Sequence, residues 1–142
     1  MIETISSNFD YVVIDGEAGI EQVNRRVMER VSHLLLVSDQ SAKGLAVAGS
    51  ILDVAHGVVR YGQCGLIVNR VRAGEKPSIS GPPEVPLLGF LPEDDAIRSY
   101  DIDGRSFLDL PECPARNSLR RCVAGFVLFP LRDDNRTRGG RA

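Results

Sequence analysis

The segment YVVIDGEAGIE, residues Tyr11–Glu21, decides the expected fold of this chain. It begins as an apolar run, continues into a carboxylate and a glycine turn, and ends where a helical pattern starts. An apolar run that stops at an acid is typical of a parallel β-strand covered on both faces. Because parallel sheets bind ligands at the carboxyl ends of their strands, we expect Asp15 at a ligand-binding edge.

The composition is that of a globular domain. Of the 142 residues, 43% are hydrophobic and 25% are charged, and about 150 residues is a usual domain size. We therefore predict one domain over residues 1–130, followed by a polar, disordered tail over residues 131–142.

Charge and hydropathy exclude two classes of partner. The formal net charge is −2, without the clustered basic face expected of a nucleic-acid-binding protein. No apolar run approaches the roughly 18 residues of a membrane span. The amino terminus lacks the basic region and apolar core of a signal peptide, so we predict a cytoplasmic protein.

Strands and helices are expected to alternate along the chain. After the strand at 11–14, the apolar pattern predicts strands at 34–37, 64–68 and 86–91, and helices at 19–31, 42–59, 94–100 and 115–129. Ser38 and Asp39 are expected to cap the helix that starts at Ala42. This alternation predicts an α/β fold with a mostly parallel sheet flanked by helices.

Polar residues follow each expected strand: Asp15, Asp39, Asn69 and residues 92–94. Since the carboxyl ends of parallel strands share one edge, we expect these residues to line a single rim of the sheet. Any α/β domain carries polar residues there, so the pattern alone identifies no ligand.

Four segments, taken in order, resemble a known family: Val13–Glu21, Val37–Leu45, Ile67–Val71 and Leu88–Asp94. They are similar to the later two-thirds of the CooC-like accessory ATPases that insert nickel into carbon monoxide dehydrogenase, which belong with the MinD/ParA group of deviant P-loop ATPases. The resemblance covers about residues 9–126. It implies an incomplete P-loop NTPase fold of the SIMIBI-like kind.

The resemblance assigns the first segment to the magnesium and switch side of a nucleotide site. Asp15 matches the acid that holds Mg²⁺ through water, a role that suits a hard carboxylate ligand. Gly19 matches the switch glycine, where a backbone without a side chain can approach the terminal phosphate. Glu17, Glu21 and Arg25 match a switch surface that faces the dimer partner or client.

The later segments match the base side of the same site. Asn69 matches the asparagine that reads the adenine edge, since its amide offers both a donor and an acceptor, and Arg70 lies beside it. Pro92 and Glu93 match the loop that closes over the base. The implied cofactors are ATP or ADP with Mg²⁺.

Simpler structural roles are open for three of these residues. Asp15 could merely cap the helix that follows it, Gly19 could be only a turn glycine, and Asn69 could bond loop backbone alone.

The sequence departs from the family where the phosphates should be held. A phosphate-binding loop needs a glycine-rich turn that carries a lysine at a helix start. Lys43 lies inside an expected helix without preceding glycines and Lys76 precedes a proline, so neither fits. We assign no catalytic residue. The cysteines, at positions 64, 113 and 122, are isolated and form no nickel-ligand motif.

We predict from this pattern the carboxyl-terminal part of a CooC-like ATPase, inactive alone. Its expected partners are a second copy or a complementary P-loop-bearing chain, with carbon monoxide dehydrogenase as the client. The alternative is a non-catalytic binding module that pairs with a partner chain. A third possibility is an unrelated flavodoxin-like domain that binds flavin.

Overall fold

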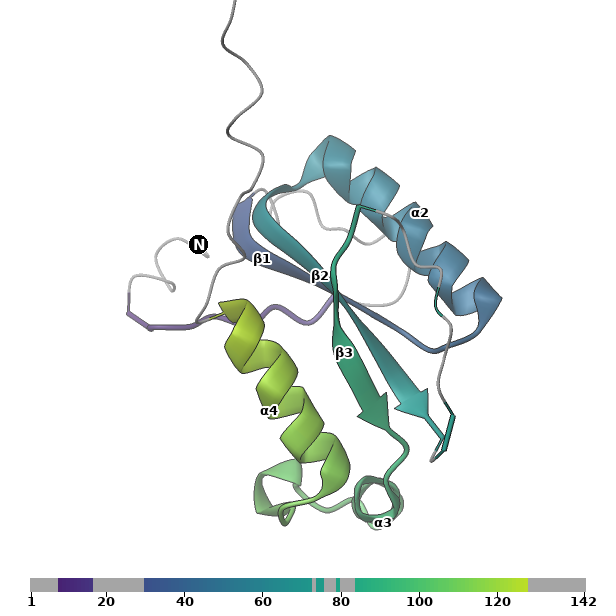
Figure 1. Ribbon diagram of the computed structural model, residues 1–142. Helices are drawn as coiled ribbons and strands as arrows, with labels where there is room; N and C mark the ends of the chain where they lie inside the picture. The colour runs from purple at the N-terminus through teal and green to yellow at the C-terminus, as the bar shows by residue number, and fades with distance from the viewer. Residues whose placement is uncertain (1–7, 17–29, 73, 76–78, 80–83, 128–142) are drawn as a thin grey trace, which may run out of the picture.

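A computed structural model describes residues 8–16, 30–72, 74–75, 79 and 84–127 (Figure 1). The predicted tail at 131–142 and residues 19–29 of the first predicted helix lie outside these ranges. The described elements, in chain order, are β1 (Arg30–Ser38), α2 (Ala42–Val58), β2 (Arg60–Val71), β3 (Leu87–Pro92), α3 (Asp95–Ile102), the short 3₁₀ helix η2 (Phe107–Asp109) and α4 (Pro114–Val127).

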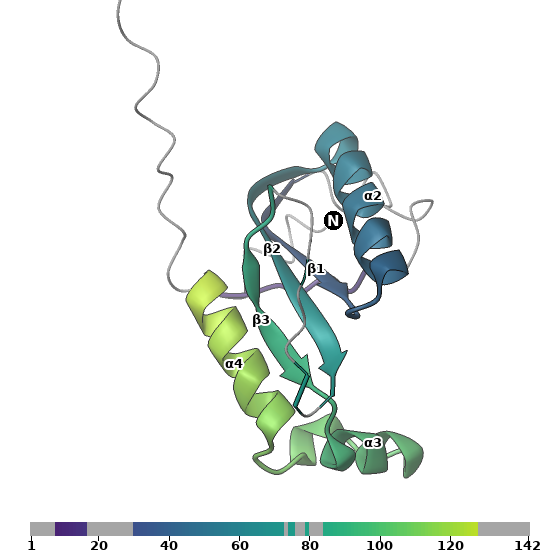
Figure 2. The ribbon, with the colours of Figure 1, turned by 45° about the vertical axis from the view of Figure 1, so that its right-hand side comes forward.

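The three strands form a parallel sheet in the order β1-β2-β3. Helix α2 lies on one face of this sheet and α4 on the other, as the two ribbon views show (Figures 1 and 2). The predicted α/β fold with a parallel sheet flanked by helices is confirmed. The arrangement is compatible with part of a P-loop NTPase-like domain.

The main core lies between the sheet and α2. Leu66 and Val68 of β2 are 1% and 0% exposed, and they pack with Leu36 of β1 against Ala48 and Leu52 of α2. Complete burial of one leucine or valine side chain contributes about 1.5–3 kcal/mol. This layer therefore fixes α2 relative to the carboxyl ends of β1 and β2.

On the opposite face, α4 approaches the sheet closely. A Cβ at Gly89 would lie 2.6 Å from the Cys122 sulfur, so the glycine in β3 makes room for the helix. Further along α4, the Phe126 ring meets the His33 ring edge-on, with the centroids 5.1 Å apart. These contacts hold α4 against β3 and against the start of β1.

The prediction of a buried strand at residues 11–14 is wrong for this structure. This run forms no strand, and the Val13 side chain is 93% exposed. In Figure 1 the purple segment runs at an angle to the strands. An apolar run becomes a strand only beside a hydrogen-bonding neighbour, and the described sheet offers residues 11–14 none.

Two boundaries also differ from the prediction. Arg30 and Val31 were expected to end a helix, but they begin β1 and pair with Arg60 and Tyr61 of β2. Ser38 and Asp39 were expected to cap α2, but the N-cap is Ser41, the residue directly before Ala42. None of the helices in the described part of the chain combines the length and apolar character that a membrane crossing requires.

Candidate functional site

The carboxyl ends of the three strands meet at one edge, toward the lower right of Figure 1, where the arrowheads of β2 and β3 lie. Asp39 follows β1, Asn69 and Arg70 lie near the end of β2, and Glu93 follows β3. The structure thus brings together Asn69, Arg70, Pro92 and Glu93, four of the residues predicted to bind the cofactor.

A β-bulge interrupts the pairing of β2 with β3 at this edge. Val68 pairs with Phe90, but the next pair is Val71 with Pro92, so Asn69 and Arg70 together oppose a single residue of β3. Arg70 has φ of 58°, which is the left-handed region and uncommon for a residue other than glycine. Bulges re-aim side chains and are frequent beside binding sites.

The Asn69 side chain stabilises the bulge and keeps part of its hydrogen-bonding capacity. Its Oδ1 accepts a hydrogen bond from the Arg70 backbone N–H at 2.9 Å. The simpler role predicted for Asn69, a bond to loop backbone, is therefore present. The Nδ2 group makes no hydrogen bond to any described residue, which leaves two donors for a ligand.

The loop after β3 joins the same edge. The Glu93 backbone N–H donates to the Val71 carbonyl at 2.9 Å, so the strand pairing extends past Pro92. The Glu93 carboxylate lies 3.9 Å from Arg72 Nε, with both side chains more than half exposed. Such an exposed ion pair stabilises little, and both groups stay accessible to a ligand.

Asp39 lies at the junction of β1 and α2 and organises the start of the helix. Its Oδ1 accepts hydrogen bonds from the Ser41 hydroxyl at 2.5 Å and from the Ser41 backbone N–H at 2.9 Å. Ser41 is the N-cap of α2, because its hydroxyl accepts from the Gly44 N–H at 2.9 Å. A Cβ at Gly44 would lie 2.8 Å from the Ser38 hydroxyl and would also meet the Asp39 carboxylate. The amino end of α2 is therefore satisfied by its own side chains.

The electrostatics of the edge favour an ionised Asp39. The two hydrogen bonds from Ser41 are the main cause that lowers the pKa of this carboxyl; burial opposes them, and the Arg70 charge adds a smaller lowering effect. The positive charge of Arg70, near the end of β2, therefore acts on this carboxylate at the end of β1. Next to it, the Gln40 side chain donates a hydrogen bond to the Glu75 carboxylate, which links the β1–α2 turn to the loop after β2.

The predicted magnesium and switch side is not assembled with this edge. Asp15 is exposed and makes no hydrogen bond or ion pair with any described residue. Gly19, Glu17, Glu21 and Arg25 lie outside the described residues. Within the described ranges, no three His, Cys, Asp or Glu side chains are grouped so that they could hold a metal ion. Asp15 alone is a chemically suitable ligand for Mg²⁺, but no other residue that the structure describes completes a site with it.

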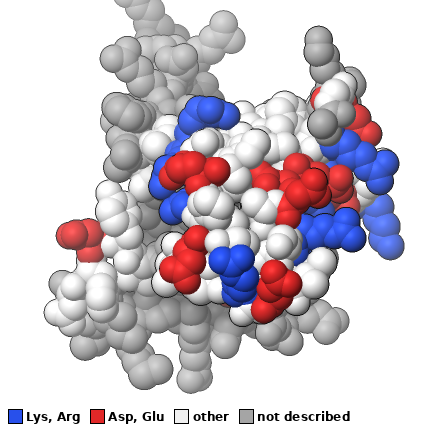
Figure 3. Space-filling view, turned by 90° about the horizontal axis from the view of Figure 1, so that it is seen from below, with Lys and Arg blue, Asp and Glu red and all other residues white. Residues whose placement is uncertain are grey.

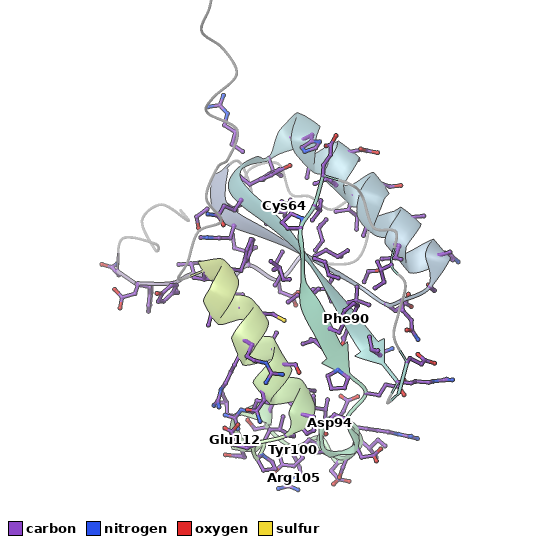
Figure 4. All side chains as sticks on the ribbon, viewed as in Figure 1. Cys64, Phe90, Asp94, Tyr100, Arg105 and Glu112 are labelled. Atoms are coloured by element: carbon purple, nitrogen blue, oxygen red, sulfur yellow. The ribbon has the colours of Figure 1, made fainter. Side chains whose placement is uncertain are left out.

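Asp94 follows Glu93 and has a structural role that the sequence pattern did not identify (Figure 4). Its Oδ1 accepts from the Ala96 N–H at the start of α3, and its Oδ2 accepts from the Ala115 N–H at the start of α4, both at 3.0 Å. These bonds, first that from Ala115, lower the pKa of the Asp94 carboxyl. One side chain therefore positions two helices below the edge. The position of Asp94 directly before α3 is a sequence signal for its role as the cap of that helix. Its hydrogen bond to Ala115 at the start of α4 has no such signal, because the two residues are distant along the chain.

The edge offers hydrogen-bond donors and cations: the Asn69 amide and the guanidinium groups of Arg70 and Arg72. These groups suit the edge of a heteroaromatic base or an anionic ligand. The bulge was not predicted, although the polar pair Asn69-Arg70 between the apolar residues Val68 and Val71 is a signal for it.

Two proteins with sequences similar to this chain are both named as ATP-binding. No family model matches this sequence, and no solved structure matches it. The chain is 29% identical over 116 residues to the uncharacterized ATP-binding protein MJ0685 of Methanocaldococcus jannaschii, which covers 79% of this chain and 46% of that protein. It is 29% identical over 100 residues to MJ0823 of the same organism, also named an uncharacterized ATP-binding protein, with 68% of this chain and 38% of that protein covered. The chain thus spans less than half the length of each of these relatives.

Proposed function

We propose that this chain supplies the base-binding side of an adenine-nucleotide site. The observation that carries the proposal is the bulge at Asn69 and Arg70, which presents an amide and a guanidinium at the carboxyl edge of the sheet. In open parallel sheets this edge is where ligands bind. The two similar proteins named as ATP-binding support an adenine nucleotide over other ligands.

The roles within the proposed site follow from hydrogen-bonding capacity. Because Oδ1 of Asn69 is engaged by Arg70 N–H, the free Nδ2 group would donate to a ring nitrogen of adenine. Pro92 and Glu93 would flank the base. When bound, the nucleotide would supply the phosphates on which a magnesium ion is held, with Asp15 and Gly19 on that side as the family resemblance implies.

The phosphate side of the site needs a contribution from a P-loop, for which this sequence has no match. We propose that the loop comes from a complementary P-loop-bearing segment or chain whose strand adds to the free side of β1. Leu35 and Val37 support this idea, since they are 38% and 57% exposed on β1 although Leu36 between them is buried. Among the described strands β1 pairs with β2 alone, and a strand with one unpaired edge and uncovered apolar side chains is suited to accept another strand.

In its most specific form the proposal follows the CooC-like resemblance. Such an assembly would hydrolyse ATP to drive a dimer switch that loads nickel, as cargo, into carbon monoxide dehydrogenase. This chain alone is expected to show no ATP turnover, because backbone amides and a lysine of the P-loop are what hold the phosphates.

The second candidate function is a non-catalytic module that uses the same free side of β1 to join a partner chain without nucleotide. The exposure of Leu35 and Val37 favours it equally. Adenosine binding separates the two functions, since the nucleotide proposal requires it and the non-catalytic module does not.

The test is a titration of adenosine followed by calorimetry, with Asn69→Asp as the main variant. Aspartate keeps the oxygen that accepts from Arg70 N–H but removes the amide donor, so the bulge is retained. We expect weak binding by the natural chain, with Kd on the order of 1 mM, and a loss of about three- to tenfold in the variant. Asn117→Asp, on the exposed face of α4, is the matched control and should leave binding unchanged. Equal binding by Asn69→Asp and the natural chain would contradict the proposal.

A further inference from the structure

Two large apolar side chains project from the end of the molecule below the sheet. Phe107 and Leu108 are adjacent in η2 and are 51% and 91% exposed. Single exposed apolar residues are ordinary, but this adjacent pair belongs to neither of the hydrophobic clusters formed by the described residues. We call these two residues the tip.

Hydrogen bonds beneath the tip hold it in this outward position (Figure 4). The Ser106 hydroxyl caps η2 by accepting from Leu108 N–H at 3.2 Å. The Tyr100 hydroxyl donates to the Asp109 carbonyl at 2.9 Å, and it accepts from Arg105 Nη2 at the same distance. The Arg105 guanidinium also lies 3.9 Å from the centre of the Tyr100 ring. A pre-ordered tip loses little conformational entropy when it binds.

The surroundings of the tip carry excess negative charge. Asp101, Asp103 and Asp109 are exposed, and none forms an ion pair with another described residue. These three carboxylates outnumber the one nearby guanidinium, that of Arg105, which contacts the neutral Tyr100 side chain. An anionic membrane surface would repel this region. The charge instead favours a partner surface that combines apolar area with positive charge.

The flank of α4 has those two properties. Leu119, which is 42% exposed, and the half-buried Val123 lie one turn apart on the same side of the helix. Arg116 and Arg120 share Glu112 as their acidic partner, at 3.9 Å and 2.7 Å, so this flank keeps excess positive charge. Seen from below, acidic and basic side chains alternate over this end of the molecule with uncharged surface between them (Figure 3).

We infer that the tip of one chain docks on the Leu119–Val123 flank of α4 in a second copy, and that the contact is reciprocal. The loop that carries Glu112 joins the tip to α4 in each chain, so both surfaces lie at the same end of the molecule. A two-fold axis beside this loop can therefore place each tip on the other chain's α4 and close the dimer. The inference goes beyond the proposed nucleotide site and does not rest on it.

The test is sedimentation velocity of the full chain over a range of concentrations without nucleotide. We expect a monomer–dimer equilibrium that weakens with salt. The double variant Phe107→Ser/Leu108→Ser should raise the dissociation constant at least about tenfold. Val47→Ser is the matched control, because Val47 is a 47% exposed apolar residue on α2, far from the tip in sequence. It should leave the dimer unchanged.

A charge exchange makes the test specific to the proposed contact. Asp109→Arg and Arg120→Asp should each weaken the dimer, and the two substitutions together should restore part of the affinity. Circular dichroism checks that every variant is folded. A chain that stays monomeric at all concentrations, or a dimer that survives the tip substitutions unchanged, would overturn the inference.

Discussion

Arg70 lies at the carboxyl edge of the sheet with a left-handed backbone, and it is the one non-glycine residue of the described ranges with positive φ. Holding an L residue in this conformation costs about 1–2 kcal/mol. This conformational cost falls on the residue at which β2 bulges and whose positive charge contributes to the lowered pKa of Asp39. Strain of this kind is often retained where it serves binding.

We predict that Arg70→Gly raises the free energy of unfolding by up to about 1 kcal/mol, because glycine adopts positive φ without a steric penalty. The same variant should bind adenosine more weakly. Urea denaturation and calorimetry on one protein sample measure both effects. Arg72→Gly is the control: it should not stabilise the chain, and a similar gain there would mean that φ at Arg70 is not the cause.

Asp94 is a residue on which two helices depend. We predict that Asp94→Ala lowers the free energy of unfolding by about 2 kcal/mol, since it leaves the N–H groups of Ala96 and Ala115 without their acceptor. Asp95→Ala, an exposed neighbour in the first turn of α3, should cost less than about 0.5 kcal/mol. Equal losses in the two variants would contradict the double-cap role.

The lowered pKa values of Asp39 and Asp94 predict the acid side of the stability profile. In both cases hydrogen bonds lower the folded-state pKa below the ordinary value of 3.8. The stabilisation is therefore complete above pH 3.8 and is lost as the pH falls through the lower folded-state values. Denaturation followed by circular dichroism between about pH 5 and pH 2 should show this loss, and it should be smaller in Asp94→Ala. A free energy of unfolding that stays constant between these two pH values would contradict the prediction.

At the scale of elements, α2 contains two glycines with opposite consequences. A Cβ at Gly44 would collide with the Ser38 and Asp39 side chains beside the Ser41 cap, whereas a Cβ at Gly57 meets nothing within 4 Å. We predict that Gly44→Ala destabilises the chain by about 1–3 kcal/mol and that Gly57→Ala stabilises it by up to about 1 kcal/mol. Thermal denaturation of the two variants measures the difference. Gains in both would show that the cap tolerates a side chain at position 44.

The sequence predicts those elements whose pattern is decided locally. The apolar stripe of α2 and the continuous apolar run at 64–68 were sufficient to predict a helix and a strand, because these two elements pack against each other within the chain. The start of β1 was not predicted: Val31 fits the helical spacing, and only its pairing with Tyr61 makes it a strand residue. The N-cap of α2 also differs from the prediction, because the Ser41 hydroxyl accepts from the Gly44 N–H while the Asp39 carboxylate accepts from Ser41 instead.

The candidate site was predicted in part at the same scale. Asn69, Arg70, Pro92 and Glu93 could be placed at one edge because the carboxyl ends of parallel strands share one edge of the sheet. The bulge was not predicted: the polar pair Asn69-Arg70 marks a break in the apolar run, but the register between β2 and β3 that makes it a bulge is not determined by the spacing of apolar residues. Asp94 shows the same limit, since its bond to Ala115 joins residues that are distant along the chain.

At the scale of the whole molecule, the described sheet ends at β1 on one side and β3 on the other. The exposure of Val13, Leu35 and Val37 marks apolar surface that a larger assembly would cover. The relatives, which are more than twice as long as the matched region, are consistent with such an assembly. The nucleotide site we propose is accordingly one side of a site that another segment completes.

The most direct measurement compares the affinities of this chain for adenosine, ADP and ATP with Mg²⁺. If the chain holds only the base, the three dissociation constants should agree within about threefold, on the order of 1 mM, and ATP should not be turned over. ATP binding more than about a hundredfold tighter than adenosine binding would require a phosphate grip within this chain. That result, together with Mg²⁺-dependent turnover abolished by Asp15→Asn, would contradict the proposed division of the site.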